Sequence, residues 1–340
     1  MTDKTKFEKP VLYYTGLKNF DEYNYSDDLK GNFICTPGDH IFYRYEVIDS
    51  IGKGSFGTVV KVFDHKHEHT MAIKLIKSDK RYTQIGIDEC NTLLNINDWY
   101  NKDKLNYDSD FIPLILYKYF KFRNHICMVF NFFPKNLYLY SCKNDFKYNE
   151  IVKISKDIFK ALDFLRNHKL IHGDLKPENI MVTKDFRGII IDYGLALFEK
   201  DATNIMYIQS RYYRAPEVYF DLDKTCAIDI WSMGCIIYEM YYNKPLFRGR
   251  NESEMIVSYI SCLGMPFSGY INTVYNKTKH RIDLYNYQYL NIPKNKYIYN
   301  NKLIDDDKNK LVHSLILKCL TYNLNMRILP KDALEAEFFN

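Results

Sequence analysis

The stretch L-I-H-G-D-L-K-P-E-N, from Leu170 to Asn179, organises the rest of this sequence. It places a carboxylate, an ammonium and a side-chain amide on one short turn, in Asp174, Lys176 and Asn179. A carboxylate accepts a proton, an ammonium neutralises phosphate charge, and an amide oxygen ligates a divalent cation. The stretch therefore predicts a loop that handles phosphate. A solvated charged loop contains the same residue types, and the spacing alone does not distinguish the two.

Length and composition limit the class of protein, because 340 residues are enough for two domains with separate cores. The 47 Lys and Arg residues against 42 Asp and Glu give a net charge of +5 without a long basic run, so nucleic acid is not indicated as a partner. The eight cysteines lack C-x-x-C or zinc-type spacing, which predicts free thiols in a reducing compartment. No apolar run approaches the roughly 20 residues of a membrane span, and the first residues do not resemble a signal peptide. We therefore expect a soluble protein of the cytoplasm, the nucleus or both, with no membrane partner.

A second motif lies in residues 51–64, I-G-K-G-S-F-G-T-V-V-K-V-F-D, where Gly52, Gly54 and Gly57 fit G-x-G-x-x-G. Several nucleotide-binding folds share this motif. A dinucleotide-binding fold requires a helix after the third glycine, so that the pyrophosphate meets the helix N-terminus. Here the β-branched run Thr58–Phe63 follows, which favours a strand, and a threonine stands where a Walker loop requires Lys. The motif therefore predicts two strands joined by a glycine-rich loop (residues 51–57) that covers a nucleotide.

Other elements are expected on both sides of these motifs. Lys74 follows M-A-I, at the end of an expected strand, and a helix is expected from Arg81 to Asn95, with Glu89 or Asp88 as the partner of the lysine. Apolar residues at three- and four-residue spacing predict a helix from Glu150 to Lys169. The remaining expectations are a polar loop at 101–110, strands at 111–122 and 126–133, a buried hairpin at 180–182 and 188–191 that leads to Asp192-Tyr193-Gly194, helices at 229–241, 251–264 and 308–320, and loop with short helices at 265–305.

The order of these motifs resembles that of the protein kinases over residues 41–340. The matching positions are the glycine-rich loop, Lys74, Glu89, Asp174 to Asn179, Asp192, the A-P-E at Ala215-Pro216-Glu217, Asp229 and Arg327. The resemblance implies an α+β, bilobal fold, with a small antiparallel sheet and one main helix in the N-lobe and a larger, mainly helical C-lobe. We expect a polar tail at 1–40, the N-lobe at 41–133 and the C-lobe at 134–340.

The same resemblance implies roles for individual residues. Asp174 would accept the proton of the attacking hydroxyl, and Lys176 would neutralise the transferred phosphoryl group. Lys74 would pair with the phosphates and with Glu89, which agrees with the family pattern better than Asp88 does. Asn179 and Asp192 would hold Mg²⁺. The residues expected at ATP are Ile51, Gly52, Lys53, Gly54, Ser55, Phe56, Gly57, Thr58, Val59, Ala72, Lys74, Phe130 (as gatekeeper), Asn131, Phe133 and Met181.

The stretch Tyr207–Glu217, Y-I-Q-S-R-Y-Y-R-A-P-E, resembles the activation segment of the dual-specificity tyrosine-phosphorylation-regulated kinases (DYRK), with their Yak-type and homeodomain-interacting relatives. Gly173 supports this, because most kinases carry Arg before the catalytic Asp. The resemblance implies that a phosphate on Tyr207 is held by Arg211 and Arg214. Residues 26–46 also resemble, more loosely, the homology box that precedes DYRK catalytic domains.

The implied function is transfer of the ATP γ-phosphate to Ser or Thr of protein substrates, after autophosphorylation on Tyr207. ATP and Mg²⁺ are the implied cofactors, the expected protein is a monomer, and the Tyr213–Arg214 region suggests a proline-tolerant substrate pocket. Two alternatives are a pseudokinase scaffold, supported by Gly173 and Tyr193, and a nucleotide-binding oxidoreductase, supported by the glycine-rich loop alone. The substrates, the pathway and the DYRK, Yak-type or homeodomain-interacting subgroup do not follow from the sequence.

Overall fold

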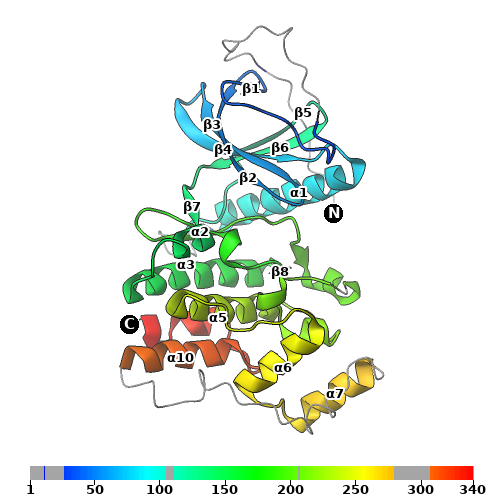
Figure 1. The fold of residues 1–340 in the computed structure, drawn as a ribbon, viewed down its shortest axis with the longest axis vertical. Helices are drawn as coiled ribbons and strands as arrows, with labels where there is room; N and C mark the ends of the chain where they lie inside the picture. Colours follow the sequence, from blue (N-terminus) through cyan, green and yellow to red (C-terminus); the bar gives the residue numbers. More distant parts are fainter. Residues whose placement is uncertain (1–10, 12–26, 105–110, 206, 279–306, 340) are drawn as a thin grey trace. The chain divides into compact units, whose positions relative to one another are not determined.

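The structure is a computed structural model that describes Val11 and residues 27–104, 111–205, 207–278 and 307–339. The chain divides into two compact units, Met1–Pro134 and Lys135–Asn340. The first unit contains an antiparallel sheet and one long helix, and the second is mainly helical (Figure 1). This organisation confirms the predicted α+β fold. Most of the expected N-terminal tail, part of the homology box and most of 265–305 lie outside the described residues.

The N-terminal unit is built on a six-stranded sheet in the order β1-β2-β3-β4-β6-β5. All neighbouring strands are antiparallel. The sheet packs against helix α1 (Lys80–Asp103), which begins at Asp79, whose side chain accepts a hydrogen bond from the Arg81 N–H. The strands are β1 (His40–Ile41), β2 (Tyr45–Lys53), β3 (Gly57–Asp64), β4 (His69–Ile76), β5 (Lys118–Phe122) and β6 (His125–Asn131).

The predicted strand after the third glycine is confirmed, because β3 starts at Gly57. Glycine is required there, since a Cβ at Gly57 would lie 1.9 Å from the carbonyl oxygen of Leu75 on β4. Along β3 buried residues alternate with partly exposed ones, and Val60 and Val62 enter the core of the unit. The β-branched run therefore forms a strand because alternate residues are buried against the sheet's core.

Two predictions in this unit were wrong in their bounds. Residues 111–116 are not part of a strand, the Tyr117 N–H donates to the Val129 oxygen of β6 at 3.0 Å, and β5 begins only at Lys118. Asn97 of α1 donates its Nδ2 to the Leu116 oxygen at 2.8 Å and accepts from the Leu116 N–H at 3.3 Å, so a helix side chain replaces a strand partner. Helix α1 also continues into the expected polar loop at 101–110, because Tyr100 is buried and donates its hydroxyl to the Phe111 oxygen at 3.1 Å.

The C-terminal unit is organised around α5 (Ala227–Tyr242), whose Trp231 is fully buried. Helices α3 and α10 both pack against α5, and the three lie in neighbouring layers in Figure 1. The other helices are α2 (Leu137–Ser141), α3 (Tyr148–Asn167), α4 (Pro216–Tyr219), α6 (Glu252–Leu263), α7 (Ser268–Thr278), α10 (Asp307–Cys319) and α11 (Pro330–Leu334). The helices predicted around 150–169, 229–241, 251–264 and 308–320 are confirmed within three residues at each end.

Two small antiparallel sheets complete this unit and frame the Leu170–Asn179 stretch. One has the order β10-β9-β7, and the other pairs β11 with β8. Their strands are β7 (Lys135–Asn136), β8 (Leu170–Ile171), β9 (Ile180–Val182), β10 (Gly188–Ile190) and β11 (Leu197–Phe198). The predicted hairpin is confirmed by β9 and β10, which pair through Ile180 and Ile190. Within the described ranges, no helix combines the length and apolar character needed to cross a membrane.

Candidate active site

The predicted catalytic loop, residues 172–179 and named the catalytic loop from here on, is attached to α5 by a buried carboxylate. Asp229 at the start of α5 accepts the backbone N–H of His172 at 2.7 Å and that of Gly173 at 3.1 Å. Asp229 is 1% exposed, and this burial raises the pKa of its carboxyl group, while the bonds from His172 and Gly173 act in the opposite direction. A buried acceptor that satisfies two backbone donors fixes the loop relative to α5.

The structure brings together the three residues that the sequence singled out. The Nζ of Lys176 lies 2.6 Å from Oδ2 of Asp174, and the Nδ2 of Asn179 donates to the backbone oxygen of Asp174 at 2.9 Å. Ser210, which the sequence analysis did not assign to the site, donates its hydroxyl to the other carboxylate oxygen, Oδ1, at 2.7 Å. Its place directly before Arg211 in the activation segment was the signal that would have identified it. Asn179 also donates its Nδ2 to Oδ2 of Asp174 at 3.2 Å, so three neighbouring side chains orient this carboxylate.

The expected metal ligands Asn179 and Asp192 also lie on adjacent backbone segments. The N–H of Ile191 donates to the Asn179 carbonyl at 2.9 Å, which places the next residue, Asp192, beside the loop. Because the Asn179 amide nitrogen bonds to Asp174, its amide oxygen is the atom oriented for a cation. A carboxylate and an amide oxygen form the hard oxygen donor set that Mg²⁺ prefers, so these residues fit the ion.

In the N-terminal unit, Lys74 on β4 pairs with Glu89 on α1. The Nζ of Lys74 lies 2.7 Å and 2.8 Å from the two oxygens of Glu89, whose side chain is only 2% exposed. Asp88, the alternative considered, is exposed and accepts a hydrogen bond from Gln84 instead. Lys74 does not end its strand as expected, since β4 continues to Ile76.

The residues expected to contact ATP are divided between the two units. In the glycine-rich loop, the Gly54 N–H donates to the Gly57 oxygen at 2.8 Å, and residues 51–55 are exposed. Ala72 and Phe130 are buried neighbours across β4 and β6. Asn131 is the last residue of β6, and Phe133 lies two residues after it. Met181 lies in β9 of the C-terminal unit.

Tyr193, which replaces the usual Phe after Asp192, is buried with 3% exposure. Its ring lies edge-on to His172, with centroids 5.1 Å apart. Burial raises the pKa of the phenol, so the hydroxyl stays neutral. Tyr193 therefore fills an aromatic position without adding charge beside Asp192.

The activation segment brings together the predicted regulatory residues. Tyr207 is 66% exposed, and the guanidinium of Arg214 lies 3.8 Å from the centroid of its ring. The pKa of Tyr207 is lowered, first by a hydrogen bond from Arg214 and further by the charges of Arg214 and Arg211. The two arginines therefore already favour negative charge at this tyrosine.

Gln209 is a second residue that the sequence did not assign to the site, and it connects the activation segment to the catalytic loop by a hydrogen bond. Its N–H donates to the Gly173 oxygen at 2.9 Å, and its own carbonyl accepts the Nη2 of Arg214 at 2.7 Å. Gly173 has a φ of +78°, and a Cβ there would lie 2.6 Å from Cδ1 of Ile208 and 2.9 Å from the Leu195 oxygen. Glycine before Asp174 is therefore required sterically.

The expected pair between Glu217 and Arg327 is formed, with Nη1–Oε1 and Nη2–Oε2 distances of 2.6 Å and 3.0 Å, and both side chains are fully buried.

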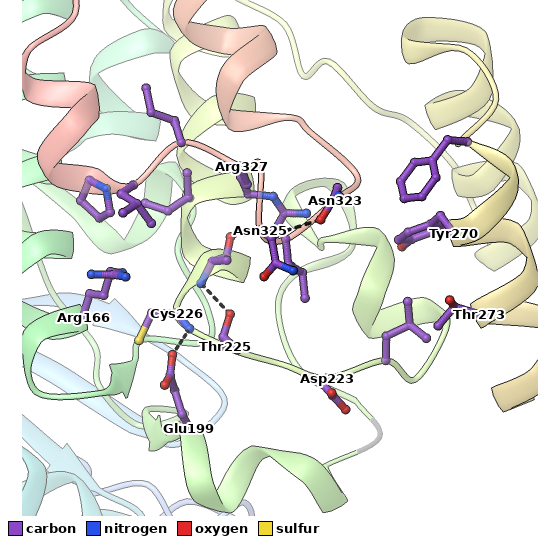
Figure 2. Close-up of a pocket in the computed structure, with 18 of the residues that line it drawn as sticks. Arg166, Glu199, Asp223, Thr225, Cys226, Tyr270, Thr273, Asn323, Asn325 and Arg327 are labelled. Carbon is purple, nitrogen blue, oxygen red and sulfur yellow. Dashed lines mark hydrogen bonds between the residues drawn. The ribbon is translucent and has the colours of Figure 1, made fainter.

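Arg327 also lines a cavity of about 850 Å³, and none of the predicted site residues is in the described lining of this cavity. Figure 2 shows Glu199 on one side of this cavity and Tyr270 and Thr273 on the other, with Arg327 between them. The buried Tyr270 hydroxyl has no hydrogen-bond partner in the described part of the chain.

Comparison with known proteins agrees with this geometry. A family model described as Protein kinase domain matches residues 45–339. The chain therefore belongs to the protein kinase family.

Within that family, the curated relatives that it resembles include DYRK kinases. Dual specificity tyrosine-phosphorylation-regulated kinase 4 of Homo sapiens is 34% identical over 326 residues, which cover 91% of this chain and 60% of the relative. Dual specificity tyrosine-phosphorylation-regulated kinase 3 of Mus musculus is 38% identical over 71% of this chain and 41% of the relative. The DYRK-family kinase pom1 of Schizosaccharomyces pombe is 37% identical over 75% of this chain and 24% of the relative. The chain thus spans between 24% and 60% of the length of these relatives.

Proposed function

We propose that this chain is an ATP-dependent protein kinase that phosphorylates Ser and Thr of proteins and autophosphorylates on Tyr207. The observation that carries the proposal is the carboxylate of Asp174, which is oriented by Lys176 and Asn179 and accepts a hydroxyl hydrogen from Ser210 at 2.7 Å. A substrate hydroxyl needs the same kind of acceptor before it attacks phosphorus.

The side chains divide the work of phosphoryl transfer. Asp174 orients the substrate hydroxyl and takes its proton, and the Lys176 ammonium beside it compensates charge that develops on the transferred group. Lys74, oriented by Glu89, binds the α- and β-phosphates. Mg²⁺, held by Asn179 and Asp192, would supply further neutralisation of the phosphate charge.

We propose a preference for proline after the phosphorylated residue. Gln209 has a φ of +68°, and its carbonyl oxygen accepts hydrogen bonds from Nε and Nη2 of Arg214. Because Arg214 already donates to the Gln209 carbonyl oxygen, this oxygen is not available to a backbone N–H of a bound peptide. Proline lacks that N–H, so it loses nothing at such a position. Peptides that differ only in proline or alanine after the acceptor serine test this preference.

The proposed location is the cytoplasm or the nucleus, because all eight cysteines are free, as expected in a reducing compartment. The modest net charge of +5 supports protein rather than nucleic acid as the substrate. We also propose that the chain acts as a monomer, which size-exclusion chromatography with light scattering measures directly.

The central test is Asp174→Asn in the purified chain, with ATP, Mg²⁺ and a serine peptide. We expect loss of at least about 10³-fold in kcat, since this substitution removes the proton acceptor but retains the shape. The control is Asp185→Asn, an exposed carboxylate that accepts a hydrogen bond from nearby Thr183 and should leave kcat unchanged. Intact-mass and peptide mapping of protein made in bacteria should find phosphate on Tyr207 in the parent and none in Asp174→Asn. Full transfer by Asp174→Asn would eliminate the proposed mechanism, and an inactive parent chain would favour a scaffold.

A further inference from the structure

The segment formed by residues 27–33, here named the N-terminal clasp, precedes the sheet and folds into a closed turn. The Asp28 carboxylate accepts the N–H groups of Lys30 and Asn32, each at 2.9 Å, and the Asn32 amide at 2.9 Å. The backbone closes the same turn, because the Gly31 N–H donates to the Asp28 carbonyl at 2.8 Å. Gly31 adopts a φ of +75°, which glycine tolerates without strain. The orientation of the Asp28 carboxylate is therefore set by its own turn.

The clasp is attached to the N-terminal unit at both of its ends. Asp27 accepts hydrogen bonds from the hydroxyl of Ser78 and, at 3.0 Å, from Nε2 of the fully buried His125. Phe33 belongs to the hydrophobic core of the unit, and its ring lies edge-on to those of Phe122 and His125. A segment fixed by a buried aromatic ring at one end and by hydrogen bonds at the other provides a rigid base.

From this base, Asp28 reaches the glycine-rich loop. Its Oδ2 lies 2.6 Å from Nζ of Lys53, the residue between Gly52 and Gly54. The pKa of Asp28 is lowered, and the hydrogen bond from Lys53 is the largest cause. Both side chains remain accessible, with 24% exposure for Asp28 and 59% for Lys53.

The other side of the glycine-rich loop is held by residues that adjoin the clasp. Lys77 donates its N–H to the Phe56 oxygen at 3.0 Å and its Nζ to the Ser55 oxygen at 2.5 Å. The next residue, Ser78, donates its N–H to the Gly31 oxygen of the clasp at 3.0 Å. The chain just after β4 therefore contacts the loop through one residue and the clasp through the next.

We propose that the N-terminal clasp positions the glycine-rich loop for ATP, with Asp28 as the positioning residue and its ion pair to Lys53 as the link. This inference rests on the proposed kinase function. A loop with three glycines and exposed side chains has many accessible conformations. The entropy that the loop loses when ATP orders it opposes nucleotide binding. Holding Lys53 on one side and Ser55 and Phe56 on the other restricts these conformations before ATP arrives. The clasp thus acts on ATP affinity and leaves the transfer step itself unchanged.

Asp28→Asn in the full chain is the first test, because asparagine retains a turn acceptor and removes the charge. We expect the KM for ATP to rise about two- to fivefold, the range that an exposed ion pair supports, with little change in kcat. The rise should shrink as salt is added, since salt screens exposed charges. Asp79→Asn is the matched control: its exposed pair with Arg81 lies near the clasp but does not contact the loop, so the KM should not change.

A double-variant cycle separates positioning from direct contact of Lys53 with the nucleotide. Lys53→Met should raise the KM for ATP in the parent, and it should raise the KM less when Asp28→Asn is already present, because the ion pair is then already lost. An unchanged KM in Asp28→Asn, or an equal effect of Lys53→Met in both backgrounds, overturns the proposal. Thermal melting of each variant checks that the unit remains folded.

Binding of a fluorescent ATP analogue by the same variants provides a readout that needs no phosphoryl transfer. If the parent chain transfers no phosphate, the proposed function fails, but a weaker dissociation constant in Asp28→Asn still supports the clasp. Equal dissociation constants in the parent and in Asp28→Asn refute the clasp even if the parent is an active kinase.

Discussion

The catalytic loop and the glycine-rich loop are both held by hydrogen bonds, but in opposite environments. The catalytic loop is tied to α5 through the 1% exposed Asp229, and its His172 is fully buried. Residues 51–55 of the glycine-rich loop are exposed, and their ion pair, between Lys53 and Asp28, lies at the surface. A proton acceptor requires a fixed geometry, whereas a loop that covers a nucleotide must admit and release it. The strength of each attachment matches the freedom that each loop needs.

Asp229→Ala removes the buried carboxylate that holds the catalytic loop, and it should have the largest effect of the variants that test this comparison. Two buried N–H groups, those of His172 and Gly173, would lose their acceptor at about 1–3 kcal/mol each, so we expect the free energy of unfolding to fall by roughly 3 kcal/mol. We also expect kcat to fall at least about 100-fold, because Asp174 follows directly on these residues. Urea denaturation and steady-state kinetics measure the two effects.

Asp229→Asn retains the shape of the side chain and one acceptor, so its losses should be smaller than those of Asp229→Ala. Asp201→Ala, an exposed position in the segment after β11, is the control and should change neither quantity. Unchanged kcat in Asp229→Ala would show that the loop does not depend on this anchor.

Alanine at a glycine of each loop gives the second comparison. Gly173→Ala forces a Cβ to within 2.9 Å of the Leu195 carbonyl oxygen at a φ of +78°, so we expect a loss of about 2 kcal/mol in the free energy of unfolding. A Cβ at Gly54 meets nothing nearer than the Gly57 oxygen at 4.0 Å, and Gly54→Ala should stay within about 0.5 kcal/mol of the parent. Urea denaturation measures both, and equal losses would refute the contrast between a tightly packed loop and an open one.

The smallest expected effect concerns the pH dependence of stability at Tyr207. Its pKa in the folded chain is lowered from the ordinary value of 10.0, so the folded state favours the phenolate. This contribution is complete above the ordinary pKa and is lost as pH falls through the lowered one. The melting temperature of the parent should therefore rise relative to that of Tyr207→Phe as pH increases from about 8 to about 10.

Both proteins in that experiment carry Asp174→Asn, so that Tyr207 stays unphosphorylated. Because Tyr207 is largely exposed, the difference should be a small fraction of the total stability. A constant difference across this range would mean that Arg211 and Arg214 do not favour negative charge at Tyr207.

Local patterns were enough to predict most of the elements that carry the site. The strand after Gly57 follows from a β-branched run with alternating burial, and α3 follows from apolar residues at three- and four-residue spacing. The predicted start of a strand at Phe111 was wrong, because Asn97, on a different element, takes the hydrogen bonds of Leu116 and β5 begins only at Lys118. A local pattern does not report such a competitor.

The Leu170–Asn179 stretch by itself determined the chemistry, since Asp174, Lys176 and Asn179 are close in sequence and share one turn. Only the tertiary structure decided what holds that turn in place, because Asp229, Ser210 and Gln209 are distant in sequence and approach it only when α5 and the activation segment pack. The same holds for Asp28 and Lys53, whose pairing depends on Phe33 entering the core. Residue type and short spacing fix which groups are available, whereas burial and chain packing fix which of them meet.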